Sequence, residues 1–160
     1  MKRIFILVSC LFLIVLFDSC EESSDGYLSG YGVTEEKEPN APDEYSGRTN
    51  VGGTEYHVSS RDVTFYVWDD GALIDGDIIT LVVNGTSVLS NYTLQGPGSK
   101  KAVNVKLDNT GYNWVLLFAH NEGTSPPNTS AVSCDDGSST QIFSLSSDLS
   151  TNGFAYIVVD

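Results

Sequence analysis

The chain has 160 residues, 41% of them hydrophobic, and carries 21 acidic against 8 basic side chains, a net charge of −13. So few Lys and Arg residues cannot displace many counterions from phosphates, which excludes a typical nucleic-acid-binding protein. The same charge is repelled by anionic lipid and favours cations or neutral polymers as partners.

The first 19 residues have the composition of a secretory signal. Lys2 and Arg3 precede a stretch, Ile4 to Phe17, that is apolar apart from Ser9. A helix over this stretch would rise about 21 Å, which is short of the ~30 Å hydrocarbon core of a bilayer. We therefore expect a cleaved signal peptide over residues 1–19 rather than a membrane-spanning helix.

The signal ends in "LFDSC", which resembles the lipobox of bacterial lipoprotein precursors, although Phe17 and Asp18 replace the usual leucine and small residue. In that family the cysteine is lipidated on its thiol and becomes the new amino terminus. The resemblance implies that Cys20 carries the lipid. Acyl chains contribute about 0.8 kcal/mol per buried CH₂ and would anchor the protein to the membrane. An ordinary signal with a chance cysteine is the alternative.

Residues 20–50 are expected to form a flexible tether behind this lipidated cysteine. Residues 21–50 carry eight acidic and two basic side chains, a net of −6, and are poor in apolar residues. Such a chain cannot bury enough surface to offset its ordering entropy. An acidic stretch after a lipidated cysteine also resembles the export signal of surface lipoproteins in Gram-negative bacteria. The resemblance implies an outer-membrane lipoprotein exposed on the cell surface; a spacer without address value is the alternative.

Residues 51–160 are predicted to form one all-β domain. Short β-rich runs are separated by Gly, Asn and Asp turns, a pattern typical of an antiparallel β-sandwich, jelly-roll-like, with about eight strands. Asn84-Gly85 predicts a type I′ hairpin turn. Residues 112–120 are apolar on both faces, which indicates a central strand. The runs are 62–70, 77–85, 87–98, 101–111, 112–123, 129–137, 139–148 and 153–160.

An acidic loop precedes the second of these runs. Asp69, Asp70, Asp75 and Asp77 stand close together with glycines between them and no nearby Lys or Arg. Calcium requires six to eight oxygen ligands, and a loop rich in carboxylates and glycine can supply several of them. We therefore predict a calcium site here. The alternative is a bare turn, because Asp and Gly are also favoured turn residues.

Two further pairs of residues are candidates for ligand binding. Tyr66 and Trp68 share a semi-polar face of the predicted strand 62–70 and could form a sugar-stacking platform, or could pack under a loop. Asn121 and Glu122 follow the central strand and enter a Pro-Pro loop, a position where sites are common on rigid sandwiches. They could bind an ion or sugar hydroxyls, or only shape the loop.

The order of short motifs over residues 62–160 resembles a small extracellular module of bacterial surface lipoproteins and larger secreted proteins. These motifs are W-D-D-G, D-G-D-I, V-N-G, N-Y-T-L, N-E-G-T-S-P-P-N-T and a closing S-D-L followed by N-G. The portion G-D followed by L-V-V-N-G is also distantly similar to calcium-dependent xylan-binding modules, β-sandwiches in which a loop-bound ion contacts sugar hydroxyls. That similarity implies Asp69, Asp75 and Asp77 as metal ligands.

Catalysis is not expected. The sequence has no Ser-His-Asp order, zinc-ligand spacing or phosphate-binding glycine loop. A glycoside hydrolase would need two carboxyl groups in a cleft, for example Glu122 and one of the aspartates, and a domain of this size has little material for a deep cleft. We expect a surface-anchored lipoprotein with a non-catalytic, calcium-dependent binding module for glycan or extracellular protein. The alternative is a structural envelope lipoprotein without a ligand site.

Overall fold

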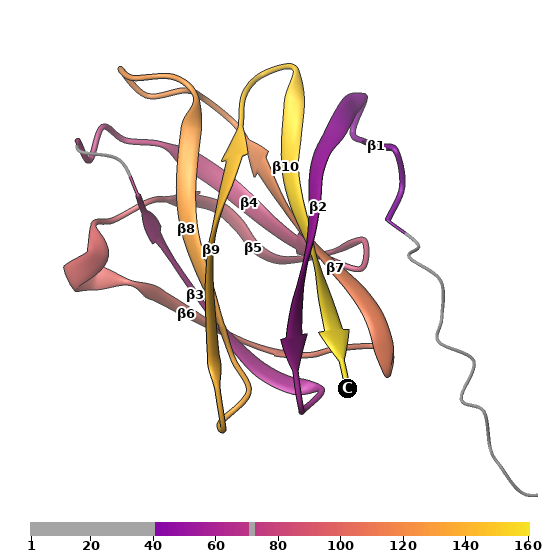
Figure 1. Cartoon of the computed structure of the whole chain (residues 1–160). Coiled ribbons are helices and arrows are strands. Elements are labelled where there is room, and N and C mark those ends of the chain that lie inside the picture. Colours follow the sequence, from indigo (N-terminus) through magenta and orange to yellow (C-terminus); the bar gives the residue numbers. More distant parts are fainter. Residues whose placement is uncertain (1–40, 71–72) are drawn as a thin grey trace, which may run out of the picture. The chain divides into compact units, whose positions relative to one another are not determined.

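The computed structural model describes residues 41–70 and 73–160, so the signal segment, Cys20 and the tether up to residue 40 lie outside the described part. Within it, ten strands and one short 3₁₀ helix follow one another (Figure 1). No helix in these two ranges has the length and apolar character to cross a membrane. The elements are β1 (Glu44–Tyr45), β2 (Arg48–Val58), β3 (Asp62–Asp69), β4 (Ile78–Val83), β5 (Thr86–Thr93), η1 (Pro97–Ser99), β6 (Lys101–Lys106), β7 (Gly111–Ala119), β8 (Asn128–Asp135), β9 (Thr140–Ser147) and β10 (Thr151–Val159).

The strands form two sheets that enclose one core. The six-stranded sheet has the order β1-β2-β10-β7-β4-β5, and the four-stranded sheet has the order β6-β3-β8-β9. Among the described strands, seven of the eight pairings are antiparallel, and β2 pairs in parallel with β10. The predicted all-β sandwich is confirmed, with ten strands in place of about eight.

The folded part begins earlier than the boundary predicted at residue 51. Residues 41–50 were assigned to the tether, but they contain β1 and the first residues of β2. Most side chains of β2 are exposed or half-buried, so no apolar alternation marks it as a strand. Its pairing with β10, about 100 residues further along the chain, stabilises it instead. Gly52 in β2 has φ +129° and lies against the carbonyl of Phe154, where a Cβ atom has no room.

The predicted hairpin at Asn84-Gly85 is confirmed. Both residues have positive φ, 48° and 84°, as a type I′ turn requires, and Val83 of β4 is opposite Thr86 of β5. The side-chain oxygen of Asn84 also accepts a hydrogen bond of 2.9 Å from the backbone N–H of Trp114. The turn residue therefore connects the hairpin to β7.

β7 is the central strand of the larger sheet, as its sequence predicts. It lies between β10 and β4. Val115 and Leu117 point into the core between the sheets, where they meet Phe65 of β3 among other buried side chains. Trp114 and Leu116 point to the other side and are buried in a second, smaller apolar cluster. This double burial explains why both faces of the strand are apolar.

Candidate metal centre

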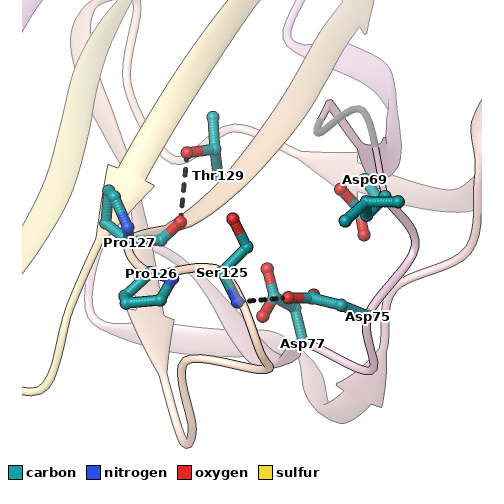
Figure 2. A pocket seen from close by; sticks show the side chains of 8 residues that line it. Asp69, Asp75, Asp77, Ser125, Pro126, Pro127 and Thr129 are labelled. Carbon is teal, nitrogen blue, oxygen red and sulfur yellow. Dashed lines mark hydrogen bonds between the residues drawn. The ribbon is translucent and has the colours of Figure 1, made fainter.

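Three of the four predicted aspartates converge at one end of the sandwich. Asp69 is the last residue of β3, in the four-stranded sheet, while Asp75 and Asp77 lie just before β4, in the six-stranded sheet. One carboxylate oxygen from each lies within 4.8 Å of the other two (Figure 2). Asp69 and Asp77 are each only 3% exposed, so two of the three carboxylates are removed from bulk water.

The backbone of the loop after β7 binds the carboxylate of Asp75. Its Oδ2 accepts hydrogen bonds of 2.7 Å from the N–H groups of both Thr124 and Ser125. These bonds, the one from Thr124 above all, lower the pKa of Asp75. Gly123, with φ +54°, lies directly under this carboxylate, and a Cβ atom there would collide with it. Asp75 is therefore an ionised carboxylate fixed in position by the loop.

Asp77 lacks such support. Its Oδ1 is buried and accepts no hydrogen bond from any described residue. Burial, the negative charges of Asp75 and Asp69, and a hydrogen bond that the protonated side chain shares with Asp75 together raise the pKa of Asp77 to about 6. At neutral pH the folded protein therefore contains an ionised, buried carboxylate whose oxygen faces two other carboxylates. Like charges in this arrangement destabilise the fold unless a cation joins them.

A cavity of about 250 Å³ adjoins the carboxylates. Figure 2 shows the side chain of Ser125 and the Pro126-Pro127 segment on the side opposite Asp69, with Asp75 and Asp77 between them. The peptide between the two prolines is cis. The lining residues are Asp69, Leu73, Asp75, Asp77, Ser125, Pro126, Pro127 and Thr129. Ser125 and Thr129 line the same cavity, where the Thr129 hydroxyl donates a hydrogen bond of 3.4 Å to the carbonyl of Pro127 (Figure 2).

The spacing of the carboxylates suits calcium. Calcium–oxygen distances are about 2.4 Å, so two ligands on opposite sides of the ion lie about 4.8 Å apart. One carboxylate oxygen from each of the three aspartates lies within 4.8 Å of the other two, so all three could reach one calcium ion. Magnesium–oxygen distances of about 2.1 Å would need a span of only ~4.2 Å and a nearly ideal octahedron. The spacing of the three carboxylates is therefore compatible with calcium, the larger of the two ions.

Asp70, the fourth predicted ligand, does not belong to the cluster. It is exposed, and its Oδ2 accepts a hydrogen bond of 2.6 Å from the hydroxyl of Ser144 on β9. The reason is strand alternation: Asp69 has the same parity as the core residues Val67 and Phe65, so the next residue points to the outer face. The structure thus brings together three of the four predicted aspartates, Asp69, Asp75 and Asp77, and not Asp70.

Asn121 and Glu122 shape loops in the described structure. Asn121 Oδ1 accepts a hydrogen bond of 2.6 Å from the N–H of Ile78, and its Nδ2 donates one of 2.9 Å to the carbonyl of Gly76. Glu122 Oε1 accepts a hydrogen bond of 3.2 Å from the N–H of Leu149. Asn121 therefore holds both sides of Asp77 in place, which makes it a positioning residue rather than an ion ligand.

The face of β3 that carries Tyr66 and Trp68 offers little open stacking surface. Trp68 is only 7% exposed, and Lys100 Nζ lies 3.8 Å from the centre of its ring. Tyr66 is half-buried. Two interpretations were given for these aromatics, a sugar-stacking platform and packing under a loop. Trp68 fits the second, because a sugar could reach its ring only if Lys100 moved away.

Three residues of the site were not singled out from the sequence, namely Gly123, Ser125 and Thr129. The two hydroxyl residues flank the Pro-Pro segment, and that position was their only local signal. The role of Gly123 depends on the approach of Asp75, which is 48 residues earlier in the chain, so no local pattern marks it.

The chain matches no protein-family model, no curated protein and no solved structure. The resemblances to lipoproteins and to xylan-binding modules therefore remain predictions from the sequence. The candidate metal centre is assigned on the geometry of its carboxylates alone.

Proposed function

We propose that this chain is a lipid-anchored, non-catalytic binding protein of the cell surface whose β-sandwich binds Ca²⁺ through Asp69, Asp75 and Asp77. One observation carries the proposal: the buried Oδ1 of Asp77 has no hydrogen-bond donor among the described residues and lies within a cluster of three carboxylates. A buried charge without a partner costs several kcal/mol unless an opposite charge compensates it. A divalent cation supplies that charge.

The position of the site supports a role in recognition. Calcium takes six to eight oxygen ligands, and three carboxylates that contribute one oxygen each leave positions for oxygens from outside. The cavity is bordered by the exposed side chains of Leu73 and Ser125, so an outside group can reach it. Sugar hydroxyls and carboxylates of a partner protein both have the required chemistry. We therefore expect an extracellular glycan or protein as the ligand, with Cys20 as the lipidated anchor residue in the outer membrane.

A calcium titration tests the metal site. The full chain, purified in detergent, is melted in chelator and in calcium up to millimolar concentrations. A free calcium concentration of 100 times Kd stabilises the folded state by about 2.7 kcal/mol, a shift of several degrees in Tm. Asp75→Asn and Asp77→Asn should abolish the shift, whereas the exposed neighbour Asp70→Asn should retain it. No shift for the wild type, or equal shifts for all four proteins, would show that the cluster binds no calcium.

The ligand and the anchor need separate experiments. On a glycan array, binding that disappears with chelator and with Asp77→Asn supports recognition through the ion; binding that chelator leaves unchanged would leave the aspartates with only a turn role. Cys20→Ala should move the protein from the membrane fraction to the soluble fraction. A variant that stays with the membrane would show that the lipobox interpretation is wrong.

A further inference from the structure

The connections between strands gather at two ends of the sandwich (Figure 1). The end with the three-aspartate cluster, called the cluster end below, has the connections after β3, β5, β7 and β9, and the other end has those after β2, β4, β6 and β8. Among the described residues, five large apolar side chains are exposed, and three of them, Leu73, Ile74 and Leu149, lie in connections of the cluster end. The connections at the other end have none.

Two loops of the cluster end surround the candidate calcium site with apolar side chains. Leu73, Pro126 and Pro127 line the cavity beside the carboxylates, and all three are exposed. Ile74, which is 61% exposed, lies directly on the segment before η1, because a Cβ atom on Gly96 would collide with its side chain. The apolar residues before Asp75 are therefore held in place next to the site.

The other two loops of the cluster end are fixed beside them. Pro97 is exposed in η1, and the N–H of Asp69 donates a hydrogen bond of 2.8 Å to the carbonyl of Gln95, which joins this loop to the cluster. Leu149 is 53% exposed, and its N–H is bonded to Glu122 in the loop after β7. Exposed apolar side chains gathered in this way mark a contact surface. These apolar tips are Leu73, Ile74, Pro97, Pro126, Pro127 and Leu149.

The form of this surface favours a lipid bilayer over a protein or a glycan. The apolar tips are exposed on four separate loops, so a folded protein would need a matching hollow for each of them, whereas fluid acyl chains adapt to any arrangement. A sugar ring stacks its apolar face on aromatic rings, and the described residues of the four loops include no Phe, Tyr or Trp. Aliphatic side chains around a cation suit a surface that has phosphate groups above hydrocarbon.

Charge indicates the kind of headgroup. Lys100 and Lys101 are exposed at the beginning of β6, at the cluster end, and Asp70 and Asp148 are acidic groups at the same end. A headgroup with both a phosphate and an ammonium group complements charges of both signs. Its phosphate oxygens are hard ligands of the kind that calcium binds. An anionic lipid would be repelled by the net charge of −13.

We infer that the cluster end docks on a bilayer of zwitterionic phospholipid, where a lipid phosphate binds the calcium ion and the apolar tips enter the interfacial region. The inference rests on the proposed calcium site and names lipid phosphate as a donor for the open positions of the ion. Interfacial side chains reach a depth of about 5–10 Å. Residues 21–40 follow Cys20, and twenty residues can extend to about 70 Å, so a lipid anchor permits this contact.

A fluorescent label at position 73 measures the contact. Leu73→Cys carries an environment-sensitive dye, while Cys134 is buried and stays unlabelled. The full chain is reconstituted into phosphatidylcholine vesicles with or without brominated lipid. In calcium the emission should shift to shorter wavelength and brominated lipid should quench it at least twofold; in chelator neither effect should occur. The same dye on Ser138→Cys, between β8 and β9 at the other end, should report water in both conditions.

Two variants test the apolar tips. In the protein labelled at position 73, Leu149→Asp lies on a different loop from the label and should reduce the quenching at least twofold. Val51→Asp is the matched control, because Val51 on β2 is 56% exposed and Leu149 is 53% exposed, and it should not change the quenching. Retained melting temperatures will show that both variants fold.

The melting temperature in calcium, measured on the same labelled protein, separates this inference from the proposed function. A rise in Tm with a label that stays in water would overturn the bilayer inference and keep the calcium site, with a protein surface as the remaining partner for the apolar tips. No rise in Tm would refute the calcium site itself. Quenching that is as strong in chelator as in calcium, or that occurs only when phosphatidylglycerol is added to the vesicles, would also overturn the inference.

Discussion

Calcium should decide whether the variant Asp77→Asn or the wild type is the more stable protein. Asparagine has the same shape as the protonated acid and carries no charge, so it removes the repulsion among the three carboxylates. In chelator at pH 7.5 the variant should therefore be more stable than the wild type. In saturating calcium it should be less stable, because it has lost a charged ligand.

The magnitude follows from the environment of Asp77. Its pKa is raised from 3.8 to about 6 by burial and by the charges of Asp75 and Asp69. One pKa unit corresponds to 1.36 kcal/mol, so ionisation destabilises the folded state by about 3 kcal/mol at most; we expect about 1–3 kcal/mol because the cavity admits water. Calcium at 100 times Kd would contribute about 2.7 kcal/mol to the wild type alone.

The sign of the pH dependence gives an independent check. A carboxyl group whose pKa is raised on folding binds its proton more tightly in the folded state, so this group makes the wild type more stable as the pH falls from about 7 to 4. The variant has no such group. The difference between the two proteins in chelator should therefore be largest above pH 7 and vanish near pH 4.

Urea unfolding followed by tryptophan fluorescence measures these differences, with Asp70→Asn as the matched control. Asp70 is exposed and outside the cluster, so its variant should follow the wild type in chelator and in calcium. If Asp77→Asn is less stable than the wild type in chelator, the buried oxygen has a favourable partner in the folded protein. Repulsion among the three carboxylates would then not be what destabilises the calcium-free protein.

Three further predictions concern residues around the site and the core. Asn121→Ala removes the acceptor of the Ile78 N–H and should cost about 1–3 kcal/mol in urea unfolding, with weaker calcium binding; a change below ~0.5 kcal/mol would deny it a positioning role. The carboxylate of Asp148 accepts hydrogen bonds from the hydroxyl and N–H of Ser150 and from the N–H of Thr151, and these bonds lower the pKa of Asp148 to about 2. This stabilisation is complete above about pH 4 and is lost as the pH falls through 2, so Asp148→Asn should flatten the acid limb of a pH–stability curve. Leu117→Ala, fully buried in β7, should cost about 2–5 kcal/mol, and a loss below ~1 kcal/mol would place Leu117 outside the tight core.

The sequence predicted correctly those elements that are determined by their own residues. Asn84 and Gly85 adopt positive φ because of their own chemistry, and the hairpin follows. β7 was recognised as central because both of its faces are apolar. β2 was missed because its sequence is polar and contains Gly52-Gly53, and the parallel pairing with β10 that stabilises it cannot be read from either segment alone.

In the site, too, features that depend on neighbouring residues could be predicted, and features that depend on distant residues could not. The density of aspartates predicted an acidic loop, and strand parity, had it been applied to Asp69 and Asp70, would have separated the ligand from the exposed neighbour. Loop shaping by Asn121 was one of the alternatives, but its two partners could not be predicted, since Gly76 and Ile78 are 45 and 43 residues earlier in the chain. Only the folded arrangement brings the loop after β7 against the segment before β4.

The place of the cluster in the sandwich links calcium to the whole fold. Asp69 belongs to the four-stranded sheet and Asp77 leads into the six-stranded sheet, so an ion between them would join the two sheets at the end where the chain crosses between them after β3, β7 and β9. Without the ion, the negative charges of these carboxylates would repel one another at that end. Extracellular calcium modules commonly have Kd values of about 10⁻⁴–10⁻³ M. With an affinity in that range, the ion would stabilise the sandwich outside the cell, where millimolar calcium is available, and the empty site would weaken it elsewhere.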